Sequence, residues 1–162
     1  MDMRRPDIHR TFAMPRQPGL VEHLAGNAPV NAVARVDPAS GAHVIPAGSP
    51  FPSPPDLLGS DLMDTFLDGL TKCYDLIILD SPPLMYVSDA SILSSKVDAT
   101  LFMMRWPYTK PELAKVALKK IAKRGGRVAG LVLPMVNIKR IAKYSYGDLG
   151  FVSGPAKRDY AA

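Results

Sequence analysis

The sequence of 162 residues contains a single cysteine, Cys73, and lacks any long hydrophobic run. One thiol excludes an internal disulfide and is typical of a reducing compartment. No apolar run approaches the roughly 20 residues that a helix needs to cross a bilayer. The first residues also carry charges without an apolar block behind them. We therefore predict neither a membrane span nor a signal peptide.

Charge and proline content narrow the class of protein. The net charge is +5, and basic residues gather near the start of the chain and beyond position 110. This balance fits phosphate, an acidic partner or an anionic membrane surface, and does not choose among them. The length and the 47% apolar content predict one domain with a core. Most of the 16 prolines precede position 56, which predicts little regular structure in the N-terminal third.

The run Leu76–Leu79 is closed by Asp80 and then by a proline pair. This pattern predicts a strand that is buried on both faces and that carries a carboxylate at its C-terminal tip, where open parallel sheets bind ligands. Further apolar strands are predicted at 99–104 and 128–133. Because the connections between these strands are too long for hairpins, we expect an α/β fold with a parallel sheet flanked by helices.

Two amphipathic helices are predicted to cover this sheet. The first spans 56–72 and begins at a Ser53 cap, and the second spans 110–124 and begins at a Thr109 cap. Shorter elements are predicted as a helix near 20–25, a loop over 27–42, a strand near 43–45 and a helix near 88–95. The residues expected to face the core are Leu58, Leu62, Met63, Phe66, Leu67 and Leu70 in the first helix, and Leu113, Val116, Ala117, Leu118 and Ile121 in the second.

Several segments, in order, resemble one family. The run 74–83, followed by Val87-Ser88-Asp89-Ala90, resembles the Walker B segment of the bacterial tyrosine kinases that control exopolysaccharide export. Residues 1–6 are similar to the second half of that family's Walker A′ segment, with Asp2 as its second acid and Arg4 as its arginine. The Pro18-Gly19-Leu20 segment and the segment 45–48 also match. The resemblance implies a partial P-loop NTPase-like fold.

The resemblance also implies roles for particular residues. Asp2 and Asp80 would be catalytic and would hold Mg²⁺, while Arg4, Asp80 and Ser81 would contact ATP. The phosphate-accepting side chains would be Tyr144, Tyr146 and Tyr160, in a C-terminal tail. On this interpretation, residues 1–137 form a partial kinase-like domain and residues 138–162 form a basic tail that contains tyrosines.

The phosphate-binding loop of such kinases does not occur in this sequence. No Gly-x-x-x-x-Gly-Lys-Ser/Thr motif is present, and the nearest fragment, Gly69-Leu70-Thr71-Lys72, lies inside a predicted helix. Because Met1 aligns within the Walker A′ strand, the loop is expected upstream. Pro134 also stands where the family often has an asparagine that contacts adenine, and proline can donate no hydrogen bond.

Two functional hypotheses follow. The first is the C-terminal portion of an ATP-dependent protein-tyrosine autokinase that regulates exopolysaccharide polymerisation and export, expected to be inactive alone. The second is a catalytically dead remnant that acts only as a partner of an intact polysaccharide-export kinase. Expected partners are a transmembrane chain-length regulator or intact kinase subunits, including a homo-oligomer, in the cytoplasm or at the inner face of the plasma membrane. Nucleic acid is disfavoured, because aromatic residues are not interleaved with the basic ones.

Overall fold

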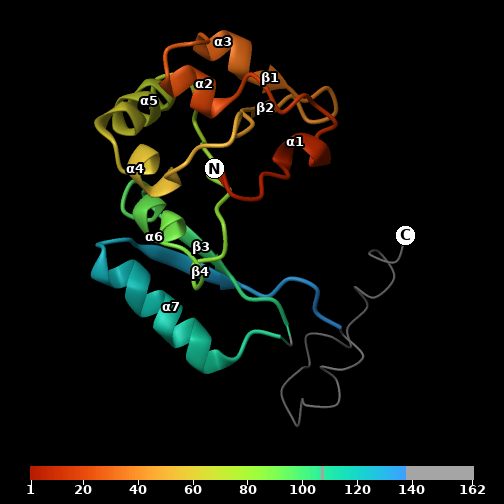
Figure 1. Ribbon diagram of the computed structural model, residues 1–162. Coiled ribbons are helices and arrows are strands. Elements are labelled where there is room, and N and C mark those ends of the chain that lie inside the picture. Colours follow the sequence, from red (N-terminus) through yellow and green to blue (C-terminus); the bar gives the residue numbers. More distant parts are fainter. Residues whose placement is uncertain (107, 138–162) are drawn as a thin grey trace.

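A computed structural model describes residues 1–106 and 108–137 of the chain (Figure 1). The predicted phosphate-accepting residues Tyr144, Tyr146 and Tyr160, and the tail that carries them, lie outside the described residues. No helix within the described ranges is both long and apolar enough to cross a membrane.

The elements form a helical layer above a small parallel sheet and its covering helix (Figure 1). The helices are α1 (Ile8–Thr11), α2 (Leu20–Leu24), α3 (Val30–Val33), α4 (Pro54–Leu58), α5 (Asp61–Thr71), α6 (Asp89–Leu93) and α7 (Pro111–Lys123). The strands are β1 (Arg35–Val36), β2 (His43–Val44), β3 (Thr100–Met103) and β4 (Val128–Val132). One apolar cluster joins α2, α4, α5 and α6, with Met3 and Ala47 packed into it.

The α/β architecture with parallel strands is confirmed by β3 and β4. They pair in parallel, with Leu101 opposite Gly130 and Met103 opposite Val132. The ladder extends at its end, where the Met104 amide donates to the Val132 carbonyl at 2.8 Å. The crossover between the two strands is α7, which lies along one face of the sheet (Figure 1).

The predicted strand over 76–79 is wrong as a member of this sheet. Its backbone has no ladder partner within the described part of the chain, and β3 pairs only with β4 there. Leu76 and Ile78 are 76% and 82% exposed, while Ile77 and Leu79 pack against the apolar cluster. The segment is therefore covered on one side only. An apolar run becomes a strand buried on both faces only where neighbouring strands supply ladder hydrogen bonds and a second layer covers the other face, and the described residues supply neither here.

The predicted helix over 56–72 is two helices, α4 and α5, separated at Gly59 and Ser60. The expected Ser53 cap makes no side-chain hydrogen bond. Ser60 caps α5 instead, because its hydroxyl accepts from the Met63 amide at 3.3 Å. The break turns Leu62 outward to 58% exposure, whereas the other core residues predicted for this region are buried.

Helix α7 lies where predicted but buries a different stripe. Lys110 is its N-cap residue, without a side-chain cap, in place of Thr109. Its buried residues are Ala114, Ala117 and Ile121, while Leu113 and Val116 are exposed. The reason is geometric: a sheet of two strands covers only a narrow face of a helix, so the flanking apolar residues have nothing to pack against.

The N-terminal third is more regular than its prolines suggest. It holds α1, α2 and α3. The strand predicted near 43–45 is confirmed as β2, which pairs in an antiparallel hairpin with β1, inside the region 27–42 that was predicted as loop. The Glu22 carboxylate ties this region together, because it accepts from the Gly19 amide at 2.7 Å and from the Ser49 amide at 3.0 Å. Burial raises the pKa of Glu22, but hydrogen bonds from Ser49 and Gly19 lower that pKa by more. The net lowering of this pKa favours the charged carboxylate, which accepts both backbone hydrogen bonds.

Candidate functional site

Asp2 and Asp80, the two acids predicted to be catalytic, line one small cavity in the upper layer. The backbone nitrogen of Met1 donates to the carbonyl of Asp80, which places residues 1–3 beside the end of the 76–80 segment. The cavity has a volume of about 20 Å³, and Ile45 and Ala47 close its apolar side. Two acids that lie 78 positions apart in the sequence therefore meet at one site.

The two carboxylates are held differently. Asp2 Oδ1 accepts from the backbone amides of Arg4 and Arg5, each at 2.9 Å, so the Asp2 side chain organises its own turn. The Asp80 side chain is exposed and makes no hydrogen bond to other described residues. Asp2 is thus positioned by the fold, while the oxygens of Asp80 remain available to a ligand.

Arg4, predicted to contact the nucleotide, is engaged by an acid on α6. Its Nε and Nη2 atoms donate to Asp89 Oδ2 and Oδ1, both at 3.0 Å. The Asp89 side chain is completely buried, and 41% of the Arg4 side chain is exposed. The hydrogen bond to Asp89 raises the pKa of Arg4. This forked pair fastens the Walker A′-like segment to the helix that follows the Walker B-like segment.

Replacing Arg4 with alanine is expected to destabilise the fold more than replacing Asp89 with asparagine. Without Arg4, the fully buried Asp89 carboxylate loses both of its charge-assisted hydrogen bonds, and a buried charge without a partner is strongly destabilising. Without Asp89, by contrast, the partly exposed Arg4 is hydrated. Urea unfolding followed by circular dichroism measures both changes. Arg5→Ala is the matched control, because Arg5 is exposed and has no described side-chain partner. Equal unfolding midpoints for Arg4→Ala and Arg5→Ala would contradict the prediction.

Two residues at the site were not singled out from the sequence. His9 and Asp7 also line the small cavity, and the buried His9 Nδ1 atom has no hydrogen-bond partner among the described residues. A volume of about 20 Å³ is enough for one water molecule, which would satisfy that nitrogen. The basic start of the chain gave no signal for these residues, because their approach to Asp80 depends on tertiary structure.

The donor set suits magnesium more than a metal that needs a full protein cage. Carboxylate oxygens are the ligands that Mg²⁺ prefers, and it is usually bound by one or two carboxylates together with substrate phosphates. Asp2 and Asp80 are the two carboxylates at this cavity that could take that role. No group of three or more His, Cys, Asp or Glu side chains that would hold a metal gathers within the described ranges. Ser81, the other residue predicted to contact ATP, is exposed and follows Asp80 in the chain.

Comparison with known proteins identifies relatives of this arrangement. The chain is 32% identical over 145 residues to the tyrosine-protein kinase etk of Escherichia coli K12, a match that covers 90% of this chain and 20% of the relative. It is 30% identical to a putative tyrosine-protein kinase in the cps region of Klebsiella pneumoniae, over 88% of this chain and 20% of that one. The chain is therefore homologous, over most of its length, to bacterial tyrosine-protein kinases. A scan against protein-family models found no match.

The fold agrees with this homology. The kinase domain of VpsO superposes with a TM-score of 0.80 at 28% identity, and the match covers 84% of this chain and 68% of that domain. The chain spans about a fifth of the length of its curated relatives. Its fold class is therefore P-loop NTPase-like.

Proposed function

We propose that the chain is the C-terminal portion of an ATP-dependent tyrosine autokinase that regulates exopolysaccharide polymerisation and export. The observation that carries this proposal is the meeting of Asp2 and Asp80 at one cavity in a chain homologous to tyrosine-protein kinases. The link to polysaccharide is supported by the Klebsiella relative, a kinase described as lying in a cps region.

In this proposal each residue at the site has a distinct task. Asp80 and Asp2 would hold Mg²⁺ near the phosphates of ATP. The Ser81 hydroxyl would donate a hydrogen bond to a phosphate oxygen of ATP. When bound, Mg²⁺ offsets the negative charge that the phosphates carry during transfer. Arg4, anchored by Asp89, keeps the Asp2 turn in place and has further N–H donors for a phosphate. Tyr144 and Tyr146, with Tyr160, would accept the phosphoryl group.

A second candidate is a catalytically inactive interaction partner of an intact export kinase. Two observations favour it: the sequence has no P-loop motif, and the apolar segment 76–79 has no described strand partner. Such a chain would associate with kinase subunits or with a transmembrane chain-length regulator, and would bind Mg²⁺ and ATP poorly.

One experiment separates the two candidates. The chain alone, incubated with labelled ATP and Mg²⁺, is expected to incorporate no label, because no lysine-bearing loop surrounds the phosphates. The same chain fused behind the P-loop segment of an etk-type kinase domain is expected to label Tyr144 or Tyr146. If a well-folded fusion incorporates no label, the second candidate, a catalytically inactive interaction partner, is supported. Label on the chain alone that disappears in Asp80→Ala would overturn the expectation of inactivity.

A further inference from the structure

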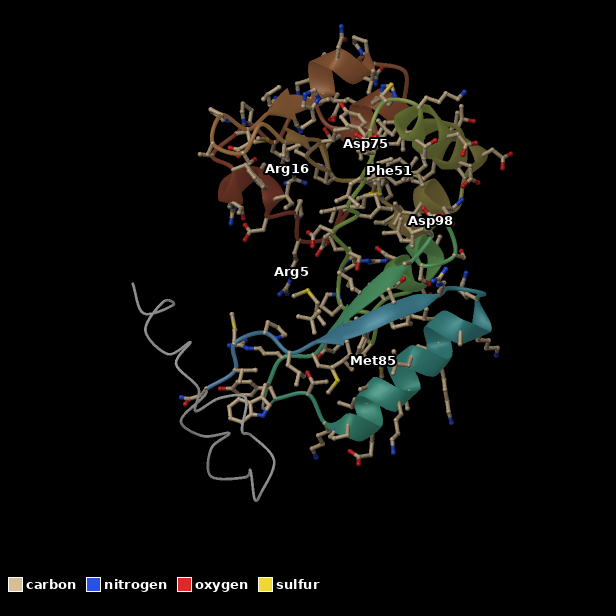
Figure 2. The ribbon with its side chains drawn as sticks, turned by 180° about the vertical axis from the view of Figure 1, so that it is seen from behind. Arg5, Arg16, Phe51, Asp75, Met85 and Asp98 are labelled. Atoms are coloured by element: carbon tan, nitrogen blue, oxygen red, sulfur yellow. The ribbon has the colours of Figure 1, made fainter. Side chains whose placement is uncertain are left out.

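A second cavity, larger than the first, lies between the segment 84–91 and the C-terminal turn of α7. Its volume is about 530 Å³, within the range of small-ligand pockets. Residues 84–88 and Ser91 form one wall, and Lys120, Lys123 and Arg124 form the other. Figure 2 shows Met85 on the α7 side of the sheet. None of these residues lines the Asp2–Asp80 cavity, so the two sites are separate.

The positive charge of this basic cavity is not neutralised by the described protein. Lys120 and Lys123, three positions apart, lie on one face of α7, and Arg124 is its C-cap residue. The described ion pairs join Arg4 to Asp89, Arg10 to Asp7 and Lys96 to Asp64, and none involves the three cations. Among the residues that the structure describes, no acidic side chain lines the cavity. The acid on neighbouring α6, Asp89, is fully buried, and Arg4 occupies both of its oxygens.

The helix dipole explains only part of this arrangement. Cations are favoured in the last turn of a helix because the carbonyl end carries partial negative charge. That preference accounts for lysines near the end of α7, but it does not account for a cavity beside them whose other wall is partly apolar. Three cations that line one cavity without a described acidic partner favour the binding of an anionic ligand there.

The facing wall combines apolar surface with hydroxyl groups. Leu84, Met85 and Val87 supply apolar contact, and Tyr86 is 86% exposed, so its ring is free to stack. Ser91 donates its hydroxyl to the Ser88 carbonyl at 2.8 Å. The Ser88 hydroxyl makes no hydrogen bond within the described ranges and remains a donor. A ligand with an aromatic or apolar body and a doubly charged head matches both walls.

We propose that this basic cavity binds an aryl phosphate monoester, the side chain of a phosphotyrosine in a peptide. Lys120, Lys123 and Arg124 hold the phosphate, while the 84–87 wall contacts the ring. Among phosphate ligands, an aryl phosphate uses the apolar wall as well as the cations. The proposal rests on the proposed function only for the source of the ligand, a tyrosine kinase. The binding itself requires no activity of this chain.

The test is titration of the full chain with phenyl phosphate by isothermal calorimetry at low ionic strength. The variant Lys120→Ser/Lys123→Ser/Arg124→Ser is expected to weaken binding at least about tenfold, because it removes three charge-assisted hydrogen bonds. Lys115→Ser is the matched control for charge on the same helix, and its effect is expected to stay below about twofold, since Lys115 does not line the cavity. These side chains are exposed, so the variants should fold, and circular dichroism verifies this.

The remaining arms identify the ligand. Phenyl phosphate is expected to bind more tightly than inorganic phosphate, and Tyr86→Ala should remove that difference. Equal weakening by Lys115→Ser and the triple variant would overturn the proposal. So would binding of anionic lipid vesicles together with failure to bind phenyl phosphate. A P-loop fusion without kinase activity that still binds phenyl phosphate would refute the proposed function and leave this site intact.

Discussion

The purified chain is expected to associate with itself as its concentration rises, instead of remaining a monomer. The cause lies in two elements that lack a strand partner within the described ranges, the extended segment 76–79 and the outer edge of β3. Leu76 and Ile78 are 76% and 82% exposed, and Leu101 and Met103 are 66% and 63% exposed. Unpaired backbone beside exposed apolar side chains is a template for strand addition.

The magnitude is large relative to the stability of a domain. Each large apolar side chain left in water forgoes roughly 1.5–3 kcal/mol of burial. Four such side chains together approach the net stability of a typical domain, about 5–15 kcal/mol. The free energy gained by burying these side chains between copies of the chain therefore strongly favours association.

Size-exclusion chromatography with light scattering over a concentration series measures this association. Ile78→Lys combined with Leu101→Lys is expected to shift the chain toward monomer, because lysines on an edge oppose pairing. Leu62→Lys is the matched control, since Leu62 is 58% exposed on α5 and belongs to neither of these elements. Fusion to an upstream P-loop segment should also restore a monomer if that segment supplies the partner strands. A monodisperse wild-type monomer with a sharp thermal transition would contradict this account.

Asp80→Asn is expected to lower tyrosine phosphorylation by the P-loop fusion at least about 100-fold. The change keeps the size and hydrogen-bonding reach of the side chain but removes the charge that would hold Mg²⁺, and losing one group that stabilises transition-state charge typically costs about 10²–10³ in rate. The fold should be little affected, because the Asp80 side chain is exposed and the hydrogen bond from Met1 goes to the backbone carbonyl of Asp80.

The matched control is Asp75→Asn, at the other end of the same extended segment. Asp75 is exposed, and Figure 2 shows it in the upper layer near Phe51, away from the β3–β4 sheet. The Asp75→Asn substitution should leave phosphorylation of Tyr144 and Tyr146 unchanged. The assay compares phosphotyrosine on Tyr144 and Tyr146 at saturating ATP and Mg²⁺. If Asp80→Asn and Asp75→Asn labelled equally, Asp80 would have no role in phosphoryl transfer.

The sequence by itself determined the features that depend on neighbouring residues. Hydrophobic periodicity located α7, and apolar runs located β3 and β4 as parallel strands joined by a crossover helix. The order Asp2, Asp80 and Ser88-Asp89 was enough to indicate the kinase family, because these motifs are short and contiguous. Such signals survive in a single sequence, since helix and strand periods are properties of local backbone geometry.

Only the tertiary structure decided the rest, because it depends on pairs of residues far apart in the chain. The apolar run 76–79 reads as a buried strand, yet it has no described strand partner, and no local pattern states whether a neighbour exists. The pairing of Arg4 with Asp89, 85 positions later, depends on where α6 packs. The basic cavity likewise forms only because the 84–91 segment passes beside the last turn of α7. Charge and burial at these places are set by packing, which a sequence period does not encode.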